Sequence, residues 1–188
     1  IIEGNVVFNP IYFGSNVIYD SLGDLFMAQQ QMQANTSLFY AQRLLSIYKK
    51  DRVTSGQHDQ YALITSYRLC LREAWIAWLN ELAVYMNLDV AEPFQLKDLD
   101  LLFKTGLPEG QLLDNLLEDS QSWLSSLLEQ IADPSKIVKS PNLKSAPAAS
   151  ALIKLVDVDD DSELELMEFI LSEFKSYMQS ARARQVEW

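Results

Sequence analysis

The chain has 188 residues, of which 48% are hydrophobic and 22% are charged, and its formal net charge is −11. This length suits one domain, and the apolar content is enough to build a core, which argues against a disordered chain. Nucleic-acid-binding proteins need a basic surface that neutralises phosphates, so an excess of 26 acidic over 15 basic side chains argues against that class.

No stretch of the sequence approaches the roughly 18 consecutive apolar residues that span a bilayer. The N-terminus also lacks the basic stretch that opens a signal peptide. Cys70 is the single cysteine, so no intrachain disulfide can form, which fits a reducing compartment. We therefore expect no membrane partner and a cytoplasmic location.

Residues 1–18 mix β-branched and aromatic side chains with Gly, Pro and Asn. Such a composition predicts a short irregular N-terminal arm instead of a helix. Residues 12–16 resemble the remnant of a cleaved purification tag, so no functional expectation rests on residues 1–16.

Two long helices are predicted next, over residues 20–50 and 59–87, because apolar residues recur there at three- and four-residue steps without a proline. In the first, Gln29 and Thr36 fall on or near the apolar stripe and are expected to form hydrogen bonds inside the bundle. The stripe of the first is Leu22, Leu25, Phe26, Met32, Phe39, Leu44, Ile47 and Tyr48. That of the second is Tyr61, Ile64, Leu71, Trp75, Trp78, Leu82 and Tyr85.

Charged side chains interrupt the apolar pattern of the second helix at Arg68, Arg72 and Glu73. A partly buried arginine needs a carboxylate or carbonyl partner, so we expect an internal salt bridge here.

The rest of the chain predicts a short helix over residues 96–104, a longer one over 112–132, and a last one over 162–184. A Pro- and Lys-rich linker at residues 134–149 precedes the last helix. Ser162 and Glu165 have the spacing of a capping box at its start. Long helices joined by short turns predict an all-α, antiparallel bundle of four to five helices, forming a single domain over residues 19–188.

No catalytic motif is present. His58 is the only histidine, and the sequence contains neither of the glycine-rich phosphate-binding patterns nor the Glu-x-x-His pairs of di-iron bundles. We therefore predict no catalytic residues, no cofactor-binding residues and no metal ligands. An enzyme with a carboxylate site in an interhelical cleft remains an alternative, because a sequence does not show which acids converge.

Residues 157–168 suggest a calcium-binding protein, which ranks ahead of the enzyme as the alternative function. Asp157, Asp159, Asp161 and Glu168 occupy positions 1, 3, 5 and 12 of an EF-hand loop, where hard oxygen ligands wrap the ion. Ser162 stands where the EF-hand has glycine at its sharp turn, and no second loop follows. The simpler interpretation is an acidic start to the last helix.

The sequence Ala-Arg-Gln-Val-Glu-Trp of residues 183–188, the aromatic-rich second helix and the acidic balance resemble small all-helical proteobacterial proteins of unknown function. The resemblance covers about residues 20–188 and implies the fold class alone. The leading prediction is a non-enzymatic protein–protein interaction module whose protein partner is unknown. An exposed apolar or aromatic patch on the bundle would support it.

Overall fold

The computed structural model describes residues 17–51, 54, 56–88, 93–135 and 160–186. In this part of the chain every regular element is helical, which confirms the predicted all-α class. The elements are α1 (Val17–Asp51), α2 (Gln57–Tyr85), the 3-10 helix η1 (Leu96–Asp98), α3 (Leu99–Phe103), α4 (Pro108–Glu118), α5 (Trp123–Ala132) and α6 (Asp160–Val186).

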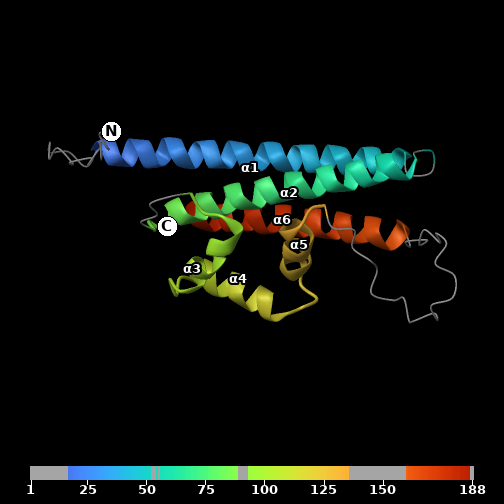
Figure 1. Ribbon diagram of the computed structural model, residues 1–188. Helices are drawn as coiled ribbons and strands as arrows, with labels where there is room; N and C mark the ends of the chain where they lie inside the picture. Colours follow the sequence, from blue (N-terminus) through green and yellow to red (C-terminus); the bar gives the residue numbers. More distant parts are fainter. Residues whose placement is uncertain (1–16, 52–53, 55, 89–92, 136–159, 187–188) are drawn as a thin grey trace, which may run out of the picture.

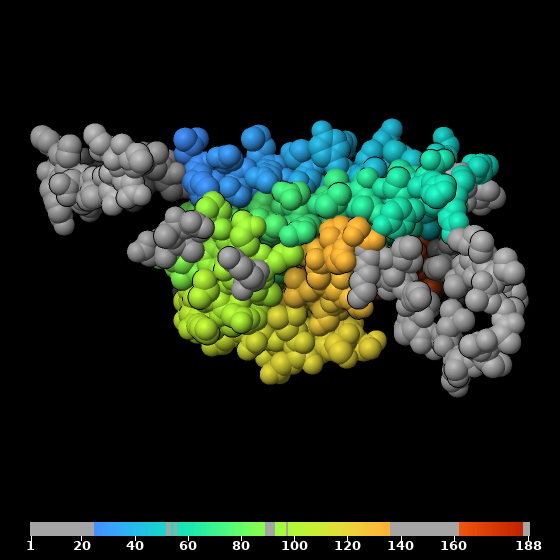
Figure 2. All heavy atoms as spheres, in the orientation of Figure 1, coloured from blue at the N-terminus to red at the C-terminus, as the bar shows by residue number. Residues whose placement is uncertain are grey.

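Three long helices form the body of the molecule (Figure 1). α1 and α2 are an antiparallel pair, and α6 lies beside them, antiparallel to α1 and parallel to α2. The shorter helices α3, α4 and α5 pack on the side away from α1, which leaves α1 along one edge of the molecule (Figure 2). The predicted antiparallel order thus holds for α1 with both neighbours, whereas α2 and α6 run in the same direction.

The inner face of α1 is a heptad seam, termed here the inner seam. Its buried residues alternate in steps of four and three, as in a coiled coil. They are Ala34, Leu38, Ala41, Leu45 and Tyr48. Two alanines in the seam let α1 approach the bundle closely.

This seam corrects the stripe predicted for residues 20–50. Leu25, Met32 and Phe39 are exposed, and so are Gln29 and Thr36, which do not point into the bundle. The buried glutamine of α1 is Gln30. Of the predicted stripe, Tyr48 does face the core. The prediction gave weight to large apolar residues and passed over Ala34 and Ala41, which belong to the buried face.

The core of the bundle is aromatic, as the α2 pattern predicted. Trp75 and Trp78 of α2 are fully buried. The ring centroid of Trp75 lies 5.4 Å from that of Phe174 and 6.3 Å from that of Trp123, both edge-on. Edge-to-face pairs of this kind add to the free energy gained by burying the rings. The aromatic cluster therefore joins α2, α5 and α6.

The helix predicted over residues 112–132 is in fact two helices, α4 and α5. The chain is extended at Asp119, whose Oδ1 accepts a hydrogen bond from Gln121 N at 2.9 Å. Ser122 then caps α5, with its Oγ accepting from Ser125 N at 3.1 Å. Asp and Ser favour such local hydrogen bonds over a continuous helix, which is why the break falls here.

Replacing Ser122 by alanine is expected to lower the free energy of unfolding by about 1 kcal/mol, because a backbone N–H at the start of α5 loses its acceptor. Urea denaturation of the two proteins would measure the difference. Ser120→Ala changes an exposed serine of the same turn and should leave the stability within experimental error. Equal effects of the two substitutions would contradict a capping role for Ser122.

Two further predictions concern residues near the ends of elements. α6 begins at Asp160, so Ser162 lies inside its first turn and does not cap it, and the predicted capping box is wrong. Residues 1–16 of the predicted arm and residues 136–149 of the predicted linker lie outside the described residues.

Candidate interaction surface

Three polar contacts, spaced seven residues apart along each helix, join α1 to α6. They are termed here the polar ladder. Each pairs one side chain of α1 with one of α6. The pairs are Asn35 with Arg182 (2.9 Å), Gln42 with Lys175 (3.0 Å) and Lys49 with Glu168 (2.7 Å). From one contact to the next the residue number rises by seven on α1 and falls by seven on α6. The three contacts therefore fix the register of this antiparallel pair.

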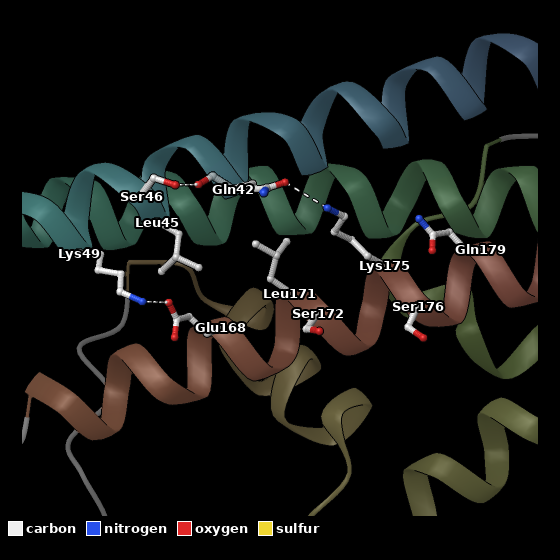
Figure 3. A pocket seen from close by; sticks show the side chains of 10 residues that line it. All are labelled: Gln42, Leu45, Ser46, Lys49, Glu168, Leu171, Ser172, Lys175, Ser176 and Gln179. Atoms are coloured by element: carbon white, nitrogen blue, oxygen red, sulfur yellow. Dashed lines mark hydrogen bonds and ion pairs between the residues drawn. The ribbon is translucent and has the colours of Figure 1, made fainter.

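A groove of about 570 Å³ runs between α1 and α6 along this ladder (Figure 3). Leu45 and Leu171 point toward each other across it, and the Lys49–Glu168 and Gln42–Lys175 contacts span it. Both lysines are thus bonded to the opposite helix. The groove is therefore explained by the packing of α1 against α6, and its lining does not by itself indicate a ligand.

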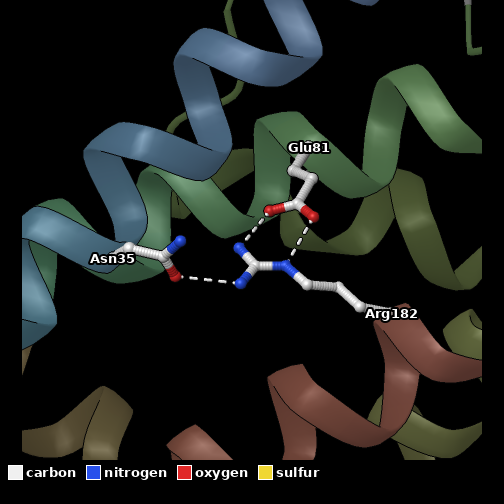
Figure 4. Close-up of polar contacts among 3 residues, drawn as sticks. All are labelled: Asn35, Glu81 and Arg182. Atoms are coloured by element: carbon white, nitrogen blue, oxygen red, sulfur yellow. Dashed lines mark hydrogen bonds and ion pairs between the residues drawn. The ribbon is translucent and has the colours of Figure 1, made fainter.

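The last rung continues into the interior (Figure 4). Arg182 donates from Nε to Glu81 Oε1 at 2.8 Å and from Nη2 to Glu81 Oε2 at 2.7 Å. Glu81 is completely buried, and the guanidinium also lies 5.5 Å from the ring centroid of Trp78. A bidentate arginine is the partner that a buried carboxylate needs, since an unpaired charge in the interior is very costly.

A second buried carboxylate, Glu109 of α4, is held in the same way. Arg184 donates from Nε to Glu109 Oε1 at 2.8 Å and from Nη2 to Oε2 at 3.0 Å. The hydrogen bond to Glu109 raises the pKa of Arg184. Catalysis by a pair of carboxylates needs two of them at one site. Glu81 and Glu109 are instead each neutralised by an arginine of their own.

The internal salt bridge expected on α2 is present. Arg68 is buried, and its Nη2 lies 3.0 Å from Glu163 Oε1 of α6. Arg72 is half-buried and Glu73 is exposed. The partner of Arg68 therefore comes from a helix about a hundred residues further along the chain.

The four residues of the predicted calcium loop are only partly described. Asp157 and Asp159 lie outside the described residues, whereas residues 160–168 are helical and Glu168 forms a rung of the polar ladder. In an EF-hand loop, residues up to about position 9 wrap the ion, so this helix starts earlier than the exit helix of such a loop. The calcium alternative stays a prediction.

The other side chains that could bind a metal ion or act as nucleophiles do not gather at one site in the described residues. Within the described residues, His, Cys, Asp and Glu side chains form no cluster of three or more that could hold a metal ion. His58 is exposed. Burial, and secondarily the nearby carboxylate of Glu73, raises the pKa of the Cys70 thiol. A raised pKa disfavours the reactive thiolate, in keeping with a structural cysteine.

The outward face of α1 carries the most unusual surface of the described residues, a line of large apolar side chains termed here the outer stripe. It consists of Leu25, Met32 and Phe39, which are 68%, 66% and 63% exposed. Tyr40, 54% exposed, packs edge-on against Phe39 with ring centroids 5.8 Å apart. Met32 lies nine residues before Ala41, which at about 100° per residue places the stripe opposite the inner seam.

The stretch of α1 that carries the outer stripe is uncharged. Residues 25–42 contain no Asp, Glu, Lys, Arg or His, the longest such run in the chain. At the overall 22% of charged residues, 18 residues would carry about four. Interface centres are depleted in charge and enriched in methionine and aromatic residues. The outer stripe and its uncharged surroundings therefore have the composition of a contact surface.

Sequence reasoning placed these residues in the core and so missed the surface. Two signals could have separated the two faces of α1. One is the four-three alternation of the inner seam through Ala34 and Ala41, and the other is the uncharged run itself.

These features define a class, an all-α bundle without a recognisable catalytic centre in the described residues and with an exposed apolar helix face. None of the helices in the described part of the chain is long and apolar enough to cross a membrane. The chain belongs to a family of unknown function, DUF6586, which matches residues 27–188. No curated protein and no solved structure matches it.

Proposed function

We propose that the protein is a non-enzymatic protein–protein interaction module, and that its contact surface is the outer stripe of α1. The observation that carries this proposal is the exposure of Leu25, Met32 and Phe39 on an uncharged helix face. The single cysteine suits a reducing compartment, and we place the interaction in the cytoplasm.

A partner bound to the outer stripe would bury its large apolar side chains. Complete burial of one such side chain contributes about 1.5–3 kcal/mol relative to full exposure. Contact through residues 25–42 would remove no ionised side chain of this run from water, and so avoids the cost of burying an unpaired charge. The groove beside the polar ladder is a weaker candidate, because its lysines already bond across it.

A photo-crosslinking amino acid at position 32, in the full chain and in the cells that naturally produce it, tests this proposal. We expect a discrete covalent adduct, whose mass and peptides identify the partner. The same amino acid at the exposed position Glu173 of α6 serves as the control and should give no adduct. Failure to form an adduct at position 32 would count against the outer stripe as a contact surface.

A further inference from the structure

The geometry points to a second copy of this chain as the occupant of the outer stripe, with the two α1 helices antiparallel. This inference rests on the proposed function, since it names the partner of the same surface. Three features of α1 carry it: the symmetric spacing of the stripe, its lack of charge, and the small residues beside its centre.

The spacing is symmetric about Met32. Leu25 lies seven residues before it and Phe39 seven residues after it. When two such helices pack antiparallel around a two-fold axis at Met32, the methionines meet each other, and Leu25 of each copy meets Phe39 of the other. A two-fold interface requires this self-complementarity, in which residue i contacts j and j contacts i. Seven-residue spacing also keeps the stripe in line along a pair of helices.

The lack of charge in residues 25–42 permits the same occupant. Each copy has a net charge of −11, so two copies repel each other over most of their surfaces. Residues 25–42 let them meet without bringing like charges together, and the polar residues among them are neutral amides and hydroxyls. A strongly charged partner would need opposite charges here, and this run offers none.

The residues beside Met32 permit close approach. In the same antiparallel register Ala28 lies opposite Thr36 of the partner, and both are exposed. Small side chains at these positions let the helices come near enough for the stripe to interdigitate. The methionine at the centre is flexible and fills irregular gaps.

The oligomeric state of the purified chain tests the inference. Light scattering after size exclusion should give about 43 kDa, twice the chain mass of 21.5 kDa. Met32→Glu places two carboxylates opposite each other at the axis and should raise the dimer dissociation constant about a hundredfold, since like-charge contacts cost several kcal/mol. Its far-ultraviolet circular dichroism should match that of the wild-type chain, because Met32 is exposed and lies outside the core.

Gln33→Glu is the matched control. It adds the same carboxylate one residue away, where it points about 100° from the stripe, and the dimer should persist. A wild-type chain of 21.5 kDa at high concentration would overturn the inference. A dimer that survives Met32→Glu would overturn the assigned interface.

Thiol cross-linking in a Cys70→Ala background tests the direction of the helices. With a short bifunctional thiol reagent, Met32→Cys should cross-link to itself. Leu25→Cys and Phe39→Cys should each remain uncross-linked alone and should cross-link when the two chains are mixed. Efficient cross-linking of Leu25→Cys alone would indicate a parallel arrangement and overturn the register.

The failures of the two proposals are distinguishable. If position 32 forms an adduct with a different protein and the purified chain is monomeric, the dimer is ruled out and the outer stripe is still a contact surface. A monomeric chain without any adduct at position 32 would overturn both.

Discussion

Arg182→Leu is expected to lower the free energy of unfolding by about 3–5 kcal/mol, the cost of leaving one member of a buried ion pair without its partner. Glu81 is completely inaccessible and receives two hydrogen bonds from Arg182, at 2.8 and 2.7 Å. The substitution also removes the contact with Asn35 and the cation over the Trp78 ring. Urea denaturation followed by far-ultraviolet circular dichroism would measure the loss.

Two controls separate the buried charge from the loss of an arginine. Arg43→Leu removes an exposed arginine of α1 and should change the free energy of unfolding by less than about 0.5 kcal/mol. The double substitution Glu81→Met with Arg182→Leu removes both charges and should recover most of the stability, because apolar replacements of buried pairs are often neutral. A double variant as unstable as Arg182→Leu would show that the loss comes from packing and not from an unpaired Glu81.

Trp75→Ala is expected to cost about 3–5 kcal/mol, the range for truncating a large buried aromatic residue. Trp75 is fully buried, and its ring contacts rings of α5 and α6, so truncation leaves a cavity where three helices meet. The midpoint of urea unfolding would fall, and its slope should stay the same if unfolding remains two-state.

Trp75→Phe is the matched variant. It keeps a ring in the cluster, and it loses no hydrogen bond, because Trp75 Nε1 has no acceptor among the described residues. Its loss should therefore be clearly smaller than that of Trp75→Ala. Equal losses would mean that the indole, and not the filled space, is what the core requires.

The sequence predicted the helices that have a single apolar face. α2 is observed at Gln57–Tyr85 against a predicted 59–87, and its tryptophans are buried as expected. The sequence identified Arg68 as needing a partner, because a charged side chain among apolar residues of a helix indicates a buried charge, and a buried charge must be paired. Its partner Glu163 could not be named, since nothing local links residues 95 positions apart.

The helix predicted over residues 20–50 is present as α1, but the prediction of its buried face failed because that helix has two apolar faces. Periodicity alone does not rank a face of Ala34 and Ala41 above a face of Met32 and Phe39, although the alanines are the ones that allow close packing. The break between α4 and α5 was missed for a different reason. The hydrogen bonds of Asp119 and Ser122 compete locally with a helix whose apolar spacing continues through them.

The polar ladder restricts which insertions and deletions α1 can accept. Its rungs at Asn35, Gln42 and Lys49 share their seven-residue spacing with the outer stripe and with the inner seam. One residue inserted between the rungs would rotate the rest of the helix by about 100° and misalign all of these faces together. Relatives of this chain should therefore tolerate insertions and deletions between the helices, and within α1 only in whole heptads.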